Sequence, residues 1–438
     1  MKNNKFFKST LILLIGTFIT KIFGFIIKII YTRVVGQEGI SMYSLIMPTY
    51  SLIVTIAGFG MPLAISKMIS EEKYLSKEIM SSSLYVLLAI NFLAMFLIIA
   101  FSGFISTTLL NAPHVKVLLI AATLAMPNMA IACIFKGYYY GKQKMLPNTI
   151  SNIIEQTIRI IFVIFFLPYF MKKSVTIGIL SFILINIITE GASILTFMFL
   201  LPKNAKINIK DIKYDKEITS NLMETTLPLV SGKIIGSIGF FFEPIILSNT
   251  MKLVGYDPSF FITEYGIYNG YSMSLLLLPS FFIVALSTSL VPEISKHYFK
   301  GNIKMVKRRM KQTLIISLIF GLITTFFIAI KSDYLLSLIY NTNKGSNYIK
   351  VLAVFFTLYY LEAPLSSMLQ ALGRGKFVMK TTTIGVFIKL ITMFLFTLLH
   401  IGIYGLIISE AINIIYIVLV NYKKVKKIIR IKEKILSI

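Results

Sequence analysis

The sequence is poor in charge, in cysteine and in histidine, and it contains no tryptophan. Only 14% of its 438 residues are charged, whereas about a quarter of the residues in a soluble domain are charged. The single cysteine, Cys133, excludes an internal disulfide framework. The three histidines, His114, His297 and His400, form no ligand cluster. We therefore expect neither a metal site nor a cofactor.

Energy-coupling motifs are also missing. The sequence has no G-x-x-x-x-G-K-[ST] loop, which excludes ATP binding through a P-loop. No polar stretch is long enough for an extramembrane enzymatic domain. We expect a protein that is not an enzyme. Its driving force would come from an ion gradient, the membrane potential or a later reaction that consumes the product.

Apolar residues dominate the chain instead. Hydrophobic residues make up 56% of the sequence, the mean hydropathy is +0.81, and long apolar runs recur along its whole length. This pattern is typical of a polytopic membrane protein built from helices. The net charge of +26 would suggest nucleic acid in a soluble chain, but here the lysines flank apolar spans and set their orientation. The first run, after Lys8, has no cleavage site and is expected to stay as a span.

The predicted fold is all-α, with about twelve transmembrane helices in two six-helix lobes. The chain is divided into an N-terminal lobe (1–201), a cytoplasmic linker (202–221), a C-terminal lobe (222–421) and a basic cytoplasmic tail (422–438). The spans fall near 9–32, 41–66, 82–105, 116–138, 148–170, 175–200, 222–248, 266–292, 311–332, 347–370, 378–399 and 401–421. Short matches recur in the same order in both halves, at Lys21 and Lys233, Pro48 and Pro279, Pro62 and Pro292, and Arg159 and Lys389. They predict an internal duplication, with the lobes related by a pseudo-two-fold axis along the membrane normal.

The basic residues between spans predict the orientation. In or beside the connections, 31 basic residues lie on one side of the membrane and 8 on the other. Since basic residues concentrate on the cytoplasmic side, both termini should be cytoplasmic. The predicted location is the cytoplasmic (plasma) membrane.

Five basic residues remain inside predicted spans: Lys21, Lys28, Arg159, Lys233 and Lys389. Lys28 is near the outer end of its span, where its side chain can snorkel to the interface. At 1.5 Å per residue, the other four lie roughly 16–18 Å deep in a hydrocarbon core of ~30 Å. Charges at that depth require a partner or a wet cavity.

Two interpretations of these four cations stay open. The first is internal pairing, with Glu155 four residues before Arg159 and further carboxylates in spans at Glu190, Glu243, Glu362 and Glu410. The second, which we favour, is a cationic midplane cavity for an anion. It would use Lys21, Arg159, Lys233 and Lys389 to bind substrate, with Asn152, Glu155, Ser237 and Glu243 in support. Polar stripes on the fifth and seventh spans favour it, because such stripes in apolar helices usually face a cavity.

Two prolines recur at matching places in the two halves: Pro48 and Pro62 in the second span, Pro279 and Pro292 in the eighth. Each removes a helical hydrogen bond and favours a kink. The repeated pair suggests a shared hinge, although membrane helices also tolerate single prolines without one.

Four segments carry a family resemblance: KIFGFIIKIIYTRVVGQEG, FKGYYYGKQKMLPN, LVPEISKHY and LSSMLQALGRGKF. They resemble the stage V sporulation protein B-like group of the polysaccharide biosynthesis family. That family belongs to the multidrug/oligosaccharidyl-lipid/polysaccharide flippase superfamily, and the resemblance covers nearly the whole chain. It implies two six-helix lobes, alternating access and transfer of lipid-linked saccharides across the bilayer.

The resemblance also implies a substrate class. In spore formers the family is associated with peptidoglycan precursors, chiefly lipid II, and with cortex assembly. Such undecaprenyl-pyrophosphate lipids carry an anion that suits a cationic cavity. The implied partners are the lipid-linked saccharide, the bilayer, a coupling ion (Na+ or H+) and cell-wall synthesis proteins, without nucleic acid. Relatives that move lipid II often have fourteen spans, so twelve spans must hold the lipid tail differently, or the substrate differs.

Two other functions compete with this one. An ion-coupled multidrug exporter of the same superfamily would share the two-lobe layout, but a pocket for cationic drugs should be acidic. A scaffold for cell-wall enzymes that transports nothing is the third alternative.

Overall fold

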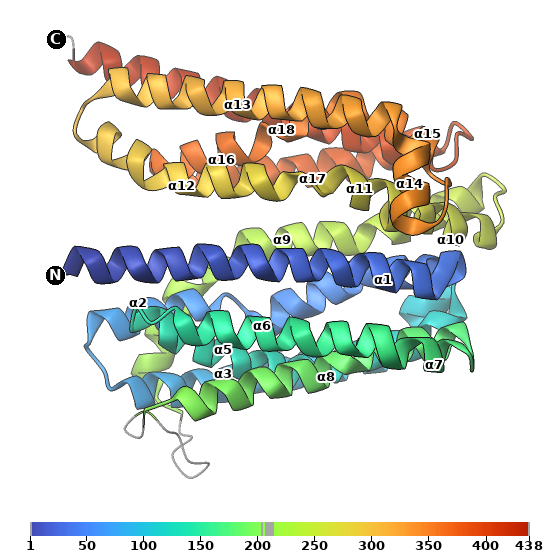
Figure 1. Ribbon diagram of the computed structural model, residues 1–438, viewed down its shortest axis with the longest axis horizontal. Helices are drawn as coiled ribbons and strands as arrows, with labels where there is room; N and C mark the ends of the chain where they lie inside the picture. The colour runs from blue at the N-terminus through green and yellow to red at the C-terminus, as the bar shows by residue number, and fades with distance from the viewer. Residues whose placement is uncertain (1, 203–204, 206–213, 437–438) are drawn as a thin grey trace. The chain divides into compact units, whose positions relative to one another are not determined.

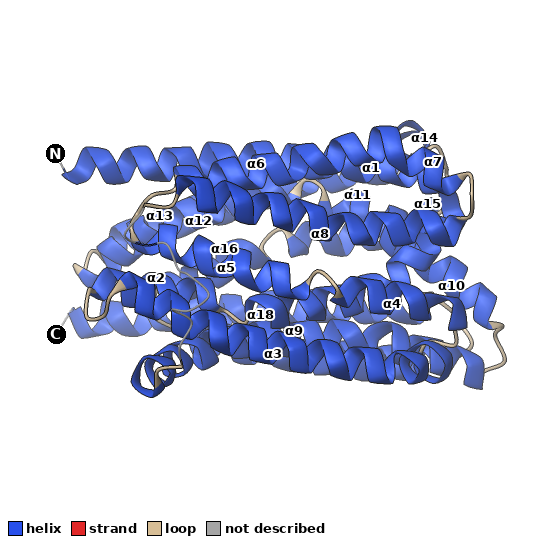
Figure 2. Cartoon of the chain, turned by 90° about the horizontal axis from the view of Figure 1, so that it is seen from below, coloured by secondary structure: helices blue, strands red, loops and turns tan. Residues whose placement is uncertain are grey.

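The structure is a computed structural model that describes residues 2–202, 205 and 214–436. These residues form helices and no strand, as Figure 2 shows, which confirms the predicted all-α fold. Packing divides the chain into two compact units, unit 1 (1–241) and unit 2 (242–438), and the division falls inside one helix. Half of the predicted linker, 202–221, lies outside the described residues. The predicted lobe boundaries therefore stay a prediction.

Unit 1 consists of helices that run side by side, as α3, α5, α6 and α8 do in Figure 1. Its helices are α1 (Lys2–Gly58), α2 (Met61–Glu71), α3 (Ser76–Phe104), α4 (Lys116–Thr123), α5 (Met126–Gly141), α6 (Leu146–Ile161), α7 (Leu167–Met171), α8 (Val175–Leu200) and the first part of α9 (Lys216–Leu253). Short 3-10 or π-helical turns join some of them, at η1 (Ile105–Leu109), η2 (Pro113–Val115) and η3 (Phe162–Phe166).

Unit 2 contains the rest of α9 and the helices that follow it. They are α10 (Pro258–Ile267), α11 (Ser274–Leu277), α12 (Ser280–Phe299), α13 (Ile303–Ile330), α14 (Ser332–Tyr340), α15 (Ser346–Tyr359), α16 (Glu362–Ala371), α17 (Gly375–Thr397) and α18 (Tyr404–Leu436). A π-helical segment, η6 (Tyr268–Met273), joins α10 to α11.

Helix α1 is two membrane spans. Gly36 has non-helical backbone angles (φ 63°, ψ −167°), a conformation that suits glycine. The rings of Tyr31 and Tyr43 lie 5.0 Å apart, whereas twelve residues of straight helix would separate them by about 18 Å. The chain therefore doubles back at Gly36. By length and composition ten helices qualify as spans, and the bent pair α10–α12 makes eleven. With α1 divided at Gly36, the described residues hold the twelve spans that the sequence predicts.

Two of the four predicted hinge prolines stand at helix breaks. Phe59 and Gly60 have positive φ angles (42° and 66°), and Pro62 follows in the first turn of α2, where no helical N–H is needed. Pro279 precedes α12 at a bend of 50°. Pro48 instead lies within the second half of α1, after Gly36, and Pro292 lies within α12. Whether these positions move in transport stays a prediction.

Glycines set the position of α5 against α2. A Cβ added at Gly137 would lie 2.9 Å from Cβ of Ile65, and one at Gly141 would lie 2.8 Å from Cβ of Ile69. Such close approach is what small residues allow between membrane helices. This contact packs α5 closely against α2, and the turn of α5 just before Gly137 carries Cys133 and Lys136.

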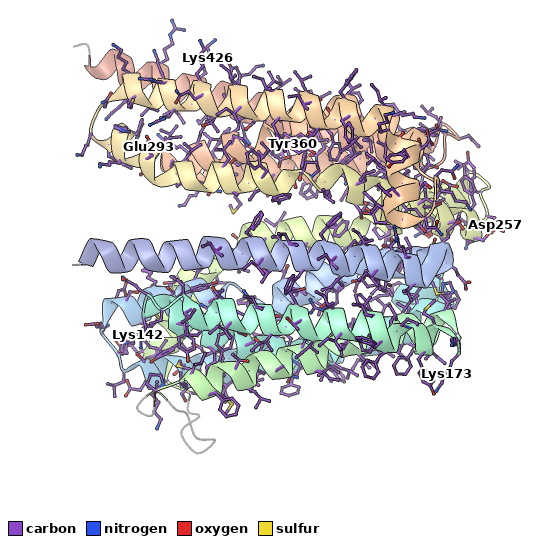
Figure 3. The ribbon with its side chains drawn as sticks, in the orientation of Figure 1. Lys142, Lys173, Asp257, Glu293, Tyr360 and Lys426 are labelled. Atoms are coloured by element: carbon purple, nitrogen blue, oxygen red, sulfur yellow. The ribbon has the colours of Figure 1, made fainter. Side chains whose placement is uncertain are left out.

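The connections alternate between the two ends of each unit. Figure 3 shows Lys142, after α5, at one end of unit 1 and Lys173, after α7, at the other. In unit 2 Figure 3 places Asp257 at the end away from Glu293 and Lys426, with Tyr360 between them. This is the alternation on which the positive-inside prediction depends. Which end faces the cytoplasm stays a prediction.

Candidate transport cavity

Helix α6 carries the polar stripe that the sequence predicts in the fifth span. Asn148 and Glu155 are buried, while Asn152 and Arg159 are half-buried. In an α-helix these spacings of four, seven and eleven residues place all four side chains on one face. The stripe therefore turns toward the interior of unit 1 and away from lipid.

Arg159 is tied to two helices. Its guanidinium donates hydrogen bonds to Oε1 of Glu155 (3.0 Å) on α6 and to Oδ1 of Asn186 (3.0 Å) and Oγ1 of Thr189 (3.3 Å) on α8. The pair with Glu155 is mostly shielded, because only 16% and 11% of the two side chains are exposed. Internal pairing thus holds at Arg159. The side chain nevertheless lines an open volume.

Two adjoining cavities in unit 1 meet at this stripe. The first has a volume of about 410 Å³ and the second about 560 Å³. Both are lined by Gly24, Lys136, Glu155, Gln156 and Glu190, so we treat them together as the unit-1 cavity. The first continues along Lys28, Arg159 and a group of aromatic rings, and the second continues along Lys21 and Asn152.

The unit-1 cavity carries an excess of positive charge. Its ionisable lining residues, tyrosines and the cysteine aside, are four cations and two carboxylates: Lys21, Lys28, Lys136, Arg159, Glu155 and Glu190. Two formal positive charges are left over. Among the described residues, Glu190 also has a buried carboxylate oxygen (Oε2) without a hydrogen-bond partner. Ionisable side chains inside membrane helices commonly mark substrate or ion pathways.

Lys136 is the ligand candidate that the sequence prediction missed. The prediction placed it two residues before the end of the span at 116–138 and counted its charge with the connection that follows, but it lies inside α5 and lines both cavities. The signal was present, because Met129, Cys133 and Lys136 have the spacing of one helix face and all three line the cavity. A lysine near a predicted span end fits a loop equally well, and the charge count alone could not separate the two.

Aromatic side chains line the first of the two cavities. They are Tyr31, Tyr43 and Tyr50 from the two halves of α1, and Phe182 from α8. The rings of Tyr31 and Phe182 stack with centroids 4.1 Å apart, and Tyr43 packs against both at 5.0 and 5.6 Å. No part of the sequence prediction identified this aromatic wall, because the four rings come together only when α1 doubles back beside α8.

The structure separates the four predicted substrate-binding cations. Lys21 and Arg159 line the unit-1 cavity. Lys233 is exposed on α9 and lines neither part of it. Its predicted neighbour Ser237 is buried, and the Ser237 hydroxyl lies 2.7 Å from that of Thr55. Of the predicted supporting residues, Asn152 and Glu155 line the cavity and Ser237 does not.

Lys389 lies in unit 2 between two carboxylates. Its Nζ is 2.6 Å from Oε2 of Glu243 and 2.5 Å from Oε2 of Glu410, and Tyr265 donates a further hydrogen bond to Glu243 (3.1 Å). These groups come from α17, α9, α18 and α10. At this position the internal-pairing interpretation describes the geometry. Glu243, predicted both to support a cavity and as a carboxylate for internal pairing, is one of the partners.

The helices long and apolar enough to cross a membrane define a polytopic membrane protein. Among solved structures, the fold is similar to an inward-facing multidrug resistance MATE family transporter of the MOP superfamily. That match has a TM-score of 0.75 at 16% identity and covers 95% of this chain and 96% of the other. An outward-facing transporter of the same description matches with a TM-score of 0.63 at 17% identity, over 98% and 96% of the chains.

The sequence comparisons give the family. A model described as polysaccharide biosynthesis protein matches residues 6–297, and a MatE model matches residues 229–395. Stage V sporulation protein B of Bacillus subtilis (strain 168) is 32% identical, over 99% of this chain and 86% of the relative. Lipid II flippase MurJ of the same organism is 23% identical, over 89% and 77%. The chain belongs to the polysaccharide biosynthesis protein family. The resemblance found in the sequence is thus confirmed.

Proposed function

We propose that this transporter moves a lipid-linked saccharide across the cytoplasmic membrane by alternating access. The substrate is an undecaprenyl-pyrophosphate saccharide, and a peptidoglycan precursor such as lipid II fits best. Its role would lie in spore cortex or cell-wall synthesis. Its pyrophosphate would occupy the unit-1 cavity beside Lys21, Lys28, Lys136 and Arg159.

The excess positive charge of the unit-1 cavity is the observation that carries the proposal. A pyrophosphate brings about two negative charges, and charge-assisted hydrogen bonds to lysine and arginine offset its loss of hydration. The cavity leaves two formal positive charges over. Relatives named as a sporulation protein and as a lipid II flippase support the same substrate class.

The remaining parts of the account are proposals as well. We propose lobes at 1–201 and 222–421, the linker at 202–221 and the tail at 422–438, with both termini cytoplasmic. Lys233 and Lys389 stay proposed ligands of lower rank than Lys136, because neither lines the unit-1 cavity. A coupling ion, Na+ or H+, and cell-wall synthesis proteins complete the proposed partners.

Binding to purified protein in liposomes tests the proposal. Wild-type protein should bind an undecaprenyl-pyrophosphate saccharide, and excess soluble pyrophosphate should weaken that binding. Lys136→Gln should weaken it by roughly 30-fold or more, since removing one desolvated partner of a charged ligand costs about 2–5 kcal/mol. Lys142→Gln is the matched control, because Lys142 is exposed just beyond the same helix. Equal binding by both variants would contradict the assignment of the cavity.

The second candidate is an ion-coupled multidrug exporter. Two observations favour it, the MatE match over residues 229–395 and the likeness to multidrug transporters. A cationic drug would be repelled by the excess positive charge of the unit-1 cavity. Efflux of cationic dyes that depends on Glu155 or Glu243, without binding of lipid-linked saccharide, would favour the exporter.

A further inference from the structure

The aromatic wall of the unit-1 cavity differs in the burial of its four rings. Tyr31 and Phe182 are buried, at 1% and 8% exposure, and their rings stack on each other, which covers one face of each ring. Tyr43 and Tyr50 are half-buried and also line the cavity. They are seven residues apart, which places them on one face of the second half of α1, two turns apart. Tyr31 and Phe182 therefore hold the ring of Tyr43 in place by packing against it. Tyr43 and Tyr50 retain exposed ring surface that a ligand in the cavity can contact.

The lining of the cavity changes along the first half of α1. Lys21, Gly24, Lys28 and Tyr31 all line the cavity, at spacings that share one helix face. Lys21 belongs to the part that has Asn152, whereas Tyr31 belongs to the part that has Tyr43 and Phe182. The rise from Lys21 to Tyr31 is about 15 Å. The cavity thus has an end without tyrosines, at Lys21 and Asn152, and an aromatic end that also carries Lys28 and Arg159.

The hydroxyl of Tyr31 has no partner at the aromatic end. Tyr31 is 1% exposed, and its hydroxyl has no hydrogen-bond partner among the described residues. A buried hydroxyl without a partner is unfavourable, by about 1–3 kcal/mol. Most buried polar groups are satisfied in folded proteins, so the Tyr31 hydroxyl is an exception. It is enclosed in the wall and offers the cavity no exposed oxygen.

We propose that the aromatic end is a saccharide subsite, with one sugar ring lying against Tyr43 and Tyr50. The axial C–H bonds on one face of a pyranose carry partial positive charge, and an aromatic ring presents a negative face to them. Lys28, Lys136 and Arg159 line the same part of the cavity and hold the pyrophosphate next to this subsite. Ligand sites of this kind combine apolar walls with a few placed polar groups. This inference rests on the proposed function, and it adds that the protein binds the sugar directly as well as the pyrophosphate.

Two lipids that differ only in the sugar test the subsite. Full-length protein in liposomes is titrated with undecaprenyl pyrophosphate and with an undecaprenyl-pyrophosphate disaccharide. Tyr43→Leu should lose about 10-fold in affinity for the disaccharide lipid and nothing for the sugarless lipid. The matched control is Tyr169→Leu, since Tyr169 is a 58% exposed tyrosine of unit 1 that does not line the cavity. It should bind both lipids as wild type does.

Cys133 provides a readout that needs no change in the wall. It is the only cysteine, it lines the same part of the cavity as the tyrosines, and a thiol reagent therefore reports on that place alone. The disaccharide lipid should slow the alkylation of wild-type protein more than the sugarless lipid does. This measurement holds even where Tyr43→Leu fails to fold.

The possible outcomes separate this inference from the proposed function. An equal loss for both lipids in Tyr43→Leu, or no loss for either, would overturn the saccharide subsite and leave the pyrophosphate site standing. The same holds for equal protection of Cys133 by both lipids. Wild-type protein that binds neither lipid contradicts the proposed function, and the subsite is then overturned with it.

Discussion

Among single residues, Gly24 borders both parts of the unit-1 cavity, and a Cβ built on it meets nothing within 4 Å. A larger side chain there would project into space that the substrate is proposed to occupy. Most glycines at helix contacts behave differently, as Gly137 does against Ile65. Position 24 therefore allows folding and binding to be tested apart.

Gly24→Leu should fold and insert normally and yet lose binding of the lipid-linked saccharide by at least about 10-fold, because the leucine fills the cavity. Gly191→Leu on α8 is the control, since a Cβ there also meets nothing within 4 Å and Gly191 does not line the cavity. Size-exclusion profiles and binding isotherms of both variants check the expectation. Undiminished binding by Gly24→Leu would contradict the proposal that the substrate binds in this cavity.

At the scale of elements, charged side chains join the helices of unit 2. Lys389 on α17 contacts Glu243 on α9 and Glu410 on α18, and the exposed parts of the two carboxylates are only 3% and 10%. Removing the partner of a buried charge is strongly destabilising, because an uncompensated charge remains. Here one ammonium serves two carboxylates. Loss of this ammonium should therefore weaken the packing of α9, α17 and α18 on one another.

Lys389→Ala should lower the stability of the protein by about 3–5 kcal/mol, seen as a clear fall in the unfolding temperature in detergent. Lys380→Ala on the same helix is the control, because Lys380 is exposed and contacts none of these carboxylates. Its unfolding temperature should stay near that of wild type. If Lys389→Ala is as stable as Lys380→Ala but loses substrate binding, Lys389 is a ligand and not a structural partner.

The elements also show what could be predicted from the sequence. Twelve spans followed from apolar run lengths, because a bilayer demands about twenty apolar residues per helix. The predicted connection between the first two spans, 33–40, contains the break at Gly36. The carboxylates that pair with Lys389 were among those named in advance. The pairing itself was not predictable, since it depends on how α9, α17 and α18 are rotated about their axes. The aromatic wall was missed for a related reason. Tyr31 and Phe182 are far apart in sequence, and they meet only through the packing of α1 against α8.

For the whole molecule, the asymmetry of basic residues predicts one orientation in the membrane. Single cysteines placed at Lys142 and Lys304, in a Cys133→Ser background, should react only with reagents that reach the cytoplasm. Cysteines at Lys252 and Lys344 should react from outside. The physical reason is that translocating lysine-rich connections is unfavourable. External labelling at position 142 or 304 would overturn the orientation and, with it, the even number of spans in each half.

The measurement that tests the central claim most directly is transfer of a fluorescent undecaprenyl-pyrophosphate saccharide between leaflets in proteoliposomes, followed by quenching from outside. Wild-type protein should move the lipid faster than protein-free vesicles do. Lys136→Gln and Gly24→Leu should reduce transfer by at least about 10-fold, while Lys142→Gln and Gly191→Leu should keep the wild-type rate. Transfer no faster than in protein-free vesicles, or equal transfer by all four variants, would contradict a lipid-linked saccharide flippase that works through the unit-1 cavity.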